Sequence, residues 1–323
     1  MKVSVLVPVY NGEPFLAECL ETVLAQDFAD MEILVADDAS TDGSVALVEC
    51  YAAKDSRVRW WRNPGKLGLA RNFNCCLRAA TGEYIKYVLQ DDKLVSPLAI
   101  RSMVGLLDNH PRVALVGSAS QVIDAQSRLL ETRNGFCRSG VWEGKRAIAQ
   151  CLEQNQNLIG EPTVTMFRKE QAARGFDERY RQVPDLEMWF YLLEQGQFAW
   201  LAEPLCAFRR HPRQQTEVNR RNHVGGDEQW ILMRTCFAKP WVRKMISHRA
   251  LFRQIYHLRK QRDEQAGLLA AEMMAALKPR RFAFYWLERR ITRPFENLKN
   301  WLAKNFRRRA CRDRLPHQNH PVA

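Results

Sequence analysis

The sequence predicts an α/β fold with a three-layer α/β/α arrangement around one sheet. Short apolar segments rich in β-branched and aromatic residues alternate with segments of helical periodicity over the first hundred residues, which is the pattern of parallel βαβ units. Two of the apolar segments end abruptly in paired acids, Asp37 with Asp38 and Asp91 with Asp92. Because ligands of open α/β sheets bind at the carboxyl ends of strands, these acids also predict where a functional site lies.

Residues 1–109 contain four expected pairs of strand and helix. We expect strands at 3–9, 31–36, 58–61 and 84–89, and helices at 15–26, 44–53, up to about residue 80, and at 98–109. The fourth strand is almost uninterruptedly apolar, which is typical of a parallel strand that is buried on both faces. For the two acids that follow this strand, an Asp-rich turn before a helix that opens at Ser96 and Pro97 is the alternative interpretation.

Beyond residue 109 the alternation is less regular. We expect strands at 113–117, 163–167 and 198–201, a hairpin near 124–130, and helices at 145–154 and from about Val183 to a stop at Gly196. From about residue 217 the pattern is helical throughout. We therefore predict an α/β domain at 1–215 and a helical region at 216–323.

The composition shows a strong charge asymmetry. The net charge is +13, and residues 239–323 carry 21 Lys/Arg and 6 Asp/Glu, so the remainder of the chain is close to neutral. Such a basic region favours attachment to an anionic membrane leaflet or to nucleic acid. With no secretory segment after Met1 and no apolar run of about 18 residues, we expect a soluble, cytoplasmic body. The nine cysteines form no CxxC pair, which favours reduced, buried thiols over a zinc site.

Six short motifs in a fixed order carry a resemblance to a known family. They are Val7-Pro8-Val9-Tyr10-Asn11-Gly12, Asp37-Asp38-x-Ser40-x-Asp42, Gly68-x-Ala70-Arg71-Asn72, Gln90-Asp91-Asp92, Pro184-Asp185-x-Glu187-x-Trp189 and Arg209-x-His211. Over residues 1–215 the chain resembles the family 2 glycosyltransferases. The resemblance implies the GT-A fold and an inverting enzyme that uses a nucleotide-sugar donor, of the bacterial polysaccharide or lipopolysaccharide type.

The resemblance assigns eight residues to the nucleotide-sugar site: Pro8, Tyr10, Asn11, Asp37, Asp38, Arg71, Asp91 and Asp92. The acidic pair after the second strand implies a carboxylate for the uracil and ribose, which falls on Asp38, and a carboxylate can accept from a base N–H or a ribose hydroxyl. Ser40 and Asp42 also fit an Asx-turn and a helix cap. Arg71 would offset the charge of the donor, while Lys66 is better interpreted as a solvated surface residue.

The metal motif of the family, Asp-x-Asp, is incomplete in this chain. Leu89 occupies the position of the first Asp, so the resemblance leaves Asp91 as the metal-facing carboxylate and adds His211, for which a plain surface position remains the alternative. One carboxylate together with diphosphate oxygens and waters can still hold Mg²⁺ or Mn²⁺. We therefore expect a divalent cation, Mn²⁺ or Mg²⁺, as the cofactor.

The resemblance places the catalytic base on Asp185, the second residue of an acidic pair whose first residue is replaced by Pro184. Glu187 is the competing candidate. A helix N-cap is the structural alternative for Asp185. If Asp185 is the base, it takes the proton of the acceptor hydroxyl during a single displacement at the anomeric carbon.

The C-terminal region contains a helical stripe of apolar residues at 284, 287, 291, 295, 298, 302 and 306, flanked by Trp and many Arg and Lys. An amphipathic basic helix of this kind favours binding to an anionic membrane surface. A helix packed against the body is the alternative, and Pro294 would kink the helix or start a second one.

Together these observations predict an inverting glycosyltransferase at the inner face of the cytoplasmic membrane. The resemblance implies a nucleotide-diphosphate donor, expected to be a UDP-sugar, whose sugar moves to a hydroxyl of a glycan or lipid-linked acceptor, and we expect no nucleic acid as partner. A nucleotidyltransferase would need a Gly-rich basic loop after the first strand, where Tyr10 follows instead. A non-catalytic nucleotide-sugar-binding relative stays open because Leu89 and Pro184 depart from the active pattern.

Overall fold

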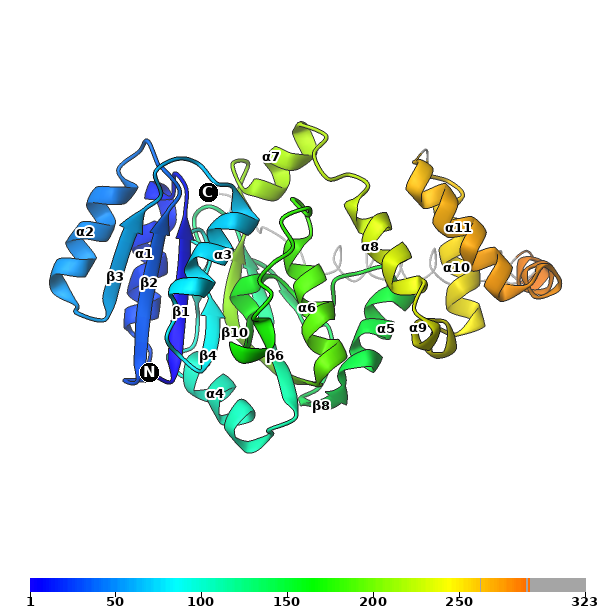
Figure 1. Cartoon of the computed structure of the whole chain (residues 1–323), viewed down its shortest axis with the longest axis horizontal. Helices are drawn as coiled ribbons and strands as arrows, with labels where there is room; N and C mark the ends of the chain where they lie inside the picture. The colour runs from blue at the N-terminus through cyan, green and yellow to red at the C-terminus, as the bar shows by residue number, and fades with distance from the viewer. Residues whose placement is uncertain (262, 289, 291–323) are drawn as a thin grey trace, which may run out of the picture. The chain divides into compact units, whose positions relative to one another are not determined.

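The computed structural model describes residues 1–261, 263–288 and 290, and Figure 1 shows their helices and strands. The chain divides into two compact units, Met1–Ile246 and Ser247–Ala323. The strands are β1 (Val3–Val9), β2 (Met31–Asp37), β3 (Val58–Arg62), β4 (Tyr84–Tyr87), β5 (Lys93–Leu94), β6 (Val113–Ile123), β7 (Leu129–Arg133), β8 (Gly140–Glu143), β9 (Thr165–Arg168) and β10 (Gln197–Arg209). The helices are α1 (Glu13–Leu24), α2 (Ser44–Lys54), α3 (Leu69–Ala79), α4 (Ala99–Asn109), α5 (Gly144–Gln154), α6 (Pro184–Gln195), α7 (Gln215–Arg221), α8 (Glu228–Phe237), α9 (Pro240–Met245), α10 (His248–Leu258) and α11 (Glu264–Leu277).

The strands of the described residues form one mixed sheet in the order β3-β2-β1-β4-β9-β6-β10-β5, with β7 beside β6 and β8 beside β10. β3, β2, β1 and β4 are parallel, as the alternation of strands and helices predicted. β9 runs antiparallel to both β4 and β6, whereas β6 and β10 are parallel. The α/β class is therefore confirmed, and the second half of the sheet adds antiparallel pairs.

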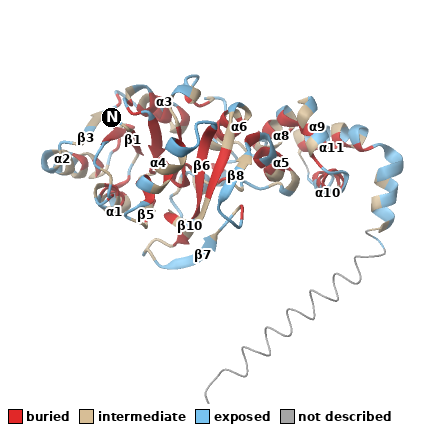
Figure 2. Ribbon diagram, turned by 90° about the horizontal axis from the view of Figure 1, so that it is seen from below, coloured by how far each residue is buried: buried red, intermediate tan, exposed pale blue. Residues whose placement is uncertain are grey.

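Helices cover both faces of the sheet, which gives three layers. On one face, alternate residues of β1 such as Val5 and Val7 pack in a core with Leu20 of α1 and Met103 of α4. On the other face, aromatic side chains connect the strands to α3 and α6: the rings of Phe73 and Tyr87 lie 4.9 Å apart, and those of Phe167 and Trp189 5.7 Å apart. Figure 2 shows the central strands as buried and the outer helical faces as exposed.

β4 is shorter than expected and contains a charged residue. All four of its residues are buried, including Lys86. The Lys86 Nζ donates to the carbonyl oxygens of Thr163 and Thr165, and burial lowers the pKa of its ammonium group. The strand ends at Tyr87, and the following turn, closed by the Asp92 N–H donating to the Leu89 carbonyl over 2.9 Å, carries the acids to the edge of the sheet.

The last strand, β10, is much longer than the expected 198–201. It pairs with β6 along its whole length, while its other side pairs first with β8 and then with β5. Pro204 lies between the segment of β10 that pairs with β8 and the segment that pairs with β5. Because no partner strand faces it on that side, its missing N–H costs no hydrogen bond there. β10 thereby carries the chain from the end of α6 to Arg209 and on to His211.

The first compact unit extends to Ile246, beyond the boundary that the sequence placed at residue 215. α7 and α8 belong to it because their polar side chains bind the loop before α6. Asn219 of α7 donates to the carbonyl oxygen of Arg181 over 3.1 Å, and Glu228 of α8 accepts from three successive backbone N–H groups of residues 181–183. A helical composition alone does not reveal such side-chain bonds.

The second unit contains α10, α11 and a further helical segment at 279–288. The side chains of Ser247 and Asp263 cap α10 and α11 by accepting from the N–H of Ala250 and Ala266. In the further segment, three large apolar side chains are exposed: Phe284 by 64%, Trp286 by 44% and Leu287 by 54%. The rest of the predicted amphipathic stripe, from residue 291, lies outside the described residues. No helix in the described part of the chain is long and apolar enough to span a bilayer.

Candidate active site

A cavity of about 540 Å³ opens at the carboxyl ends of β1, β2 and β4. This is the edge at which the sequence placed the acids, and it is where open α/β sheets bind ligands. Of the predicted site residues, those that line the cavity are Pro8, Tyr10, Asn11, Asp38, Asp91, Asp185 and His211. The structure therefore brings together predicted site residues from five of the six motifs of the sequence.

The loop after β1 is held in place by Gln90. The side-chain oxygen of Gln90 accepts from the Tyr10 N–H over 2.7 Å, and its amide nitrogen donates to the Tyr10 carbonyl over 2.9 Å. We call these two hydrogen bonds the Gln90 clamp. A Cβ at Gly12 would lie 2.5 Å from the same Gln90 oxygen, so a larger residue there would displace the Gln90 side chain. The loop after β1 is consequently fixed to the loop that carries Asp91.

Asp38 is buried and accepts three hydrogen bonds from the segment before α3. Its carboxylate accepts from the N–H groups of Leu67 and Gly68, each over 2.8 Å, and from the Asn63 amide over 3.0 Å. Two carboxylate oxygens offer about four acceptor sites, so one remains for a ligand donor. Asp37 has a different environment: it pairs with Arg62 over 3.4 Å and accepts from the Ser40 N–H, and it does not line the cavity.

Two cations follow β3 in the sequence, Lys66 and Arg71. Lys66 is exposed, as its interpretation as a solvated surface residue predicts, and it also lines the cavity, with its Nζ 3.6 Å from the centre of the Tyr10 ring. Arg71 is exposed and its Nε donates to Glu178 over 2.9 Å. Arg71 does not line the cavity, so its role in donor binding stays a prediction.

Asp91 and His211 meet at the floor of the cavity, with His211 Nε2 2.9 Å from Asp91 Oδ2. The ring of Phe15 packs 4.8 Å from the His211 ring and restricts its orientation. Two neighbouring ligands of an octahedral Mg²⁺, each at about 2.1 Å, stand about 3 Å apart, so this pair fits a shared hard cation whose other ligands come from diphosphate and water. No group of three or more potential ligands occurs among the described residues.

Asp92 serves the scaffold and does not line the cavity. It is buried, it accepts from the Thr163 hydroxyl over 2.5 Å and from the Arg209 N–H over 2.9 Å, and thus connects the end of β4 to β10. Burial, together with the nearby Asp91 charge, raises the pKa of Asp92 well above its ordinary value. The assignment of Asp92 to nucleotide-sugar binding therefore has no direct contact in support.

Asp185 lies in the first turn of α6 and faces the cavity. The helix begins at Pro184, whose missing N–H costs nothing at that position, and the N-cap residue is Val183 rather than Asp185. Desolvation by the surrounding protein, with a smaller contribution from the Glu161 carboxylate, raises the pKa of Asp185 to about 7. Two backbone hydrogen bonds to the carboxylate oppose this rise. A carboxylate with a pKa near neutrality is suited to taking a proton from a hydroxyl.

The competing acid has a different partner. Glu187 accepts from Arg174 over 2.7 Å, its side chain is only 16% exposed, and it does not line the cavity. The two acids are two positions apart on a helix, so they point in different directions. This geometry favours Asp185 over Glu187 as the base.

A model of glycosyl transferase family 2 matches residues 4–176, which is more than half of the chain. The chain belongs to this family. Among its relatives is “Putative glycosyltransferase EpsE” of Bacillus subtilis (strain 168), 32% identical over 203 residues, which cover 60% of this chain and 68% of that protein.

Solved glycosyltransferase structures have the same fold. The structure of TarS residues 1–349 of S. aureus in complex with UDP-GlcNAc has a TM-score of 0.67 at 18% identity and covers 87% of this chain and 82% of its own. The mannosyltransferase PcManGT of Pyrobaculum calidifontis in complex with GDP-Man and Mn²⁺ has a TM-score of 0.59 at 19% identity, covering 94% and 84%. The GT-A fold and the glycosyltransferase class are thereby established for this chain.

Three cavity residues of this family 2 glycosyltransferase were not singled out as site residues from the sequence. Gln90 belonged to a motif but carried no assigned role, because its partners, the N–H and carbonyl of Tyr10, are backbone groups that leave no signal in the sequence. Glu161 lines the cavity and accepts from Arg133 over 2.7 Å. Arg213, two residues after His211, is exposed at the cavity and is a cation within reach of an anionic ligand.

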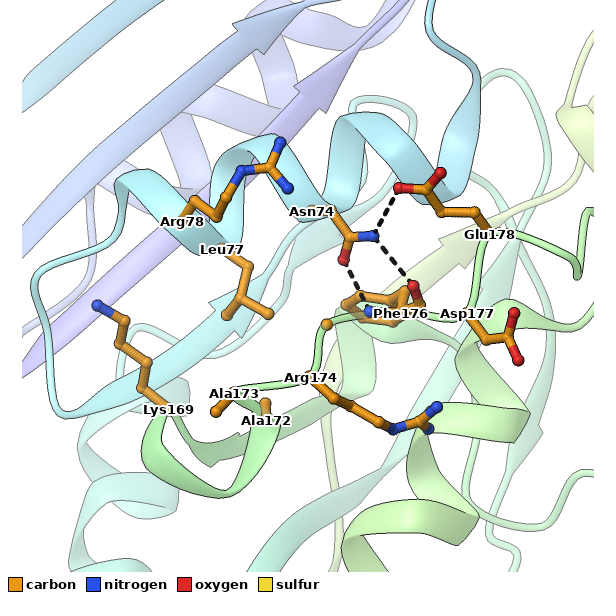
Figure 3. Close-up of a pocket in the computed structure, with 11 residues that line it drawn as sticks. Asn74, Leu77, Arg78, Lys169, Ala172, Ala173, Arg174, Phe176, Asp177 and Glu178 are labelled. Carbon is orange, nitrogen blue, oxygen red and sulfur yellow. Dashed lines mark hydrogen bonds between the residues drawn. The ribbon is translucent and has the colours of Figure 1, made fainter.

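A second cavity of about 600 Å³ lies on the other side of α3 (Figure 3). There the Asn74 amide donates to the Phe176 carbonyl over 3.0 Å and to Glu178 over 3.3 Å, while its oxygen accepts from the Phe176 N–H. Glu178 thus connects this cavity to Arg71. Both acids at this second cavity form ion pairs with arginines, Asp177 with Arg179 and Glu178 with Arg71.

Proposed function

We propose that this glycosyltransferase inverts the configuration of a sugar while moving it from a nucleoside-diphosphate donor, a UDP-sugar, to a hydroxyl of a glycan or lipid-linked acceptor. The observation that carries the proposal is the position of Asp185. Its carboxylate lines the same cavity as Asp38, Asp91 and His211, and its pKa of about 7 leaves a substantial basic fraction at neutral pH. One cavity thus contains donor-binding groups and a proton acceptor.

The bond changes form a single displacement. The acceptor oxygen attacks the anomeric carbon, its proton passes to an oxygen of Asp185, and the bond between the anomeric carbon and the diphosphate oxygen breaks, so the diphosphate leaves with its electron pair. Asp185 must stand on the face opposite the leaving group, which makes inversion the expected outcome. Proton transfer to a positioned base contributes about 10²- to 10⁴-fold in rate.

The donor side would be formed by the first two strands and the turn after β4. Asp38 has an acceptor site left for the base or ribose of the nucleotide, and the loop Pro8 to Asn11 lies beside it. Asp91 and His211 would hold Mn²⁺ or Mg²⁺. When bound, such an ion would offset the negative charge of the leaving diphosphate. Lys66 and Arg213 add positive charge at the same cavity.

The C-terminal region supports a peripheral position at the inner face of the cytoplasmic membrane. The described part of the predicted stripe exposes Phe284, Trp286 and Leu287, and the chain beyond it is rich in arginine. Aromatic and aliphatic side chains enter the interface while basic ones bind anionic headgroups. A membrane-bound acceptor, as in the synthesis of a lipopolysaccharide or another cell-surface polysaccharide, would then meet the cavity with its lipid still in the bilayer.

The proposal is tested by donor identification followed by transfer. We would screen nucleotide sugars by thermal shift with and without Mn²⁺, because a ligand that binds only the folded chain raises its melting temperature. The stabilising donor would then be incubated with extracted membrane glycolipids, and release of the nucleoside diphosphate would be measured for wild type and for Asp185→Asn. A donor that binds equally well to both proteins but is turned over only by wild type is the expected result. Equal turnover by both would exclude Asp185 as the base.

A further inference from the structure

Glu228, the first residue of α8, binds the segment that leads into the helix of the catalytic base. The residue is 8% exposed, and its two carboxylate oxygens accept from the N–H of Arg181 over 2.9 and 2.8 Å. One oxygen also accepts from the N–H of Gln182 over 2.7 Å and from that of Val183 over 3.3 Å. Three successive backbone N–H groups therefore converge on one carboxylate, and such charge-assisted bonds are stronger than neutral ones.

The backbone on the α8 side is shaped for this contact. Gly225 has a φ of +68°, and a Cβ at this position would lie 2.7 Å from a Glu228 carboxylate oxygen and 2.8 Å from the Gln182 Cβ. Only glycine combines that backbone conformation with so close an approach. From α7, Asn219 donates to the Arg181 carbonyl over 3.1 Å and to the Gln182 side-chain oxygen over 2.9 Å. Two helices that follow β10 thus bind this segment, α8 at all three residues and α7 at the first two.

The held segment is the start of α6. Val183 is the N-cap of this helix and its side chain makes no capping bond. Its own N–H and those of the two residues before it donate to Glu228 of α8, which fixes the chain just ahead of the first turn. Gln182, Pro184 and Asp185 follow one another along the wall of the cavity. The position of the Asp185 carboxylate relative to the cavity is consequently set by how this segment is held.

We propose that Glu228 is a positioning residue for catalysis: it fixes residues 181–183, and through them the carboxylate of Asp185, at the distance from which a proton can be taken from the acceptor. The inference rests on the proposed function, in which Asp185 is the base. A misplacement of about 1 Å can cost about 10²-fold in rate. Glu228 itself does not line the cavity, so it acts on the chemistry only through the backbone that leads to Asp185.

Full-length Glu228→Ala and Glu228→Gln variants test the role, with Glu194→Gln as the matched control. Glu194 stands at the other end of α6 and forms an ion pair with Lys239, so its loss also removes one bond between α6 and the segment after α8. Steady-state transfer would give kcat and the donor KM for each protein. We expect Glu228→Ala to lower kcat by roughly 10- to 100-fold at an unchanged donor KM. The kcat of Glu228→Gln should fall less, because its side-chain oxygen still accepts hydrogen bonds. The kcat of Glu194→Gln should equal that of wild type.

The double variant Glu228→Ala with Asp185→Asn separates positioning from a general loss of structure. If Glu228 acts through Asp185, its removal from a chain that already lacks the base should cost less than about twofold, whereas independent effects would multiply. Hydrogen exchange of residues 181–187 gives a readout without activity, and we expect faster exchange there in Glu228→Gln than in Glu194→Gln. Should Glu228→Ala fail to fold, Glu228→Gln would be used in its place, both for kcat with and without Asp185→Asn and for hydrogen exchange.

Three results would overturn the inference. Wild-type kcat in both Glu228 variants would do so, as would a full multiplicative loss in the double variant, because the residue would then act by another route. Undiminished turnover by Asp185→Asn alone would remove the base assignment and the positioning role with it. A dead Asp185→Asn beside fully active Glu228 variants would leave the proposed function intact and exclude only the role of Glu228.

Discussion

Replacing Asp185 by Asn gives the most direct test of the catalytic site. The change keeps the size of the side chain and removes its ability to accept a proton, so the chemical step should slow by about 10²- to 10⁴-fold while the donor affinity stays the same. Glu187→Gln is the control. Because Glu187 pairs with Arg174 and does not line the cavity, this variant should lose far less activity.

The raised pKa of Asp185, about 7, sets the pH dependence. A base works only when it is deprotonated, so kcat of wild type should rise with pH and level off above about pH 7. One unit below the pKa only about a tenth of the carboxylate is ionised, which predicts a tenfold fall per unit in more acidic buffer. A pH profile of nucleotide release, with acceptor at saturation, would measure this limb.

The same pKa has a consequence for stability that needs no substrate. The folded pKa of Asp185 lies above its ordinary unfolded value, so the folded chain binds more protons between about pH 4 and 7, and the free energy of unfolding falls as the pH rises through this window. An asparagine cannot ionise. The melting temperature of Asp185→Asn relative to wild type should therefore be higher at pH 8 than at pH 5.

Two results would refute this reasoning. A kcat that is flat from pH 5 to pH 8 in wild type would mean that no group with a pKa near 7 acts in the rate-limiting step. A dead Glu187→Gln beside an active Asp185→Asn would mean that the side chain of Glu187, not that of Asp185, reaches the acceptor.

Three further predictions concern the donor, the clamp and the tail. Asp91→Asn should abolish the Mn²⁺-dependent part of donor binding in calorimetry without unfolding the chain, and an unchanged affinity would exclude Asp91 as a ligand. Gln90→Ala removes both bonds to the Tyr10 backbone and should weaken donor binding by about 1–3 kcal/mol, measured in the same titration against Gln195→Ala as control. Deleting residues 291–323 removes eight arginines and lysines outside the described residues and should release the protein from anionic vesicles at moderate salt, where co-sedimentation of the shortened chain would place the membrane contact elsewhere.

Much of the fold was predictable because its signals are local. The strands β1 and β2 and the helices α2 and α5 lie within a residue or two of their predicted bounds, since apolar runs and helical periodicity decide them. β10 was predicted too short because its second half mixes polar residues and Pro204 with apolar ones. Its length follows from pairing with β6, a contact between segments far apart in the sequence.

The sequence predicted that acids at the ends of strands would line a cavity. It could not predict which acid of each adjacent pair would instead bind another residue of the protein. Asp38 and Asp91 line the cavity as expected. Their sequence neighbours do not, because Asp37 forms an ion pair with Arg62 and Asp92 accepts a hydrogen bond from Thr163. Alternation along a strand says that two successive residues point apart, but not which of them meets a ligand. The contact of Glu228 with residues 181–183 is likewise invisible in sequence because its partners are backbone groups.

β10 links α6, which carries Asp185, to the loop that carries His211. It begins two residues after the helix of Asp185 ends and stops two residues before His211. Its pairing with β6 contains register shifts at its start and on both sides of Pro204, and from Cys206 to Arg209 the register with β6 is continuous while β5 pairs on the other side. An insertion of one residue between Cys206 and Arg209 would turn the later side chains to the opposite face and carry His211 away from Asp91. Variants that keep both Asp185 and His211 in the cavity should therefore keep the length of this part of the strand.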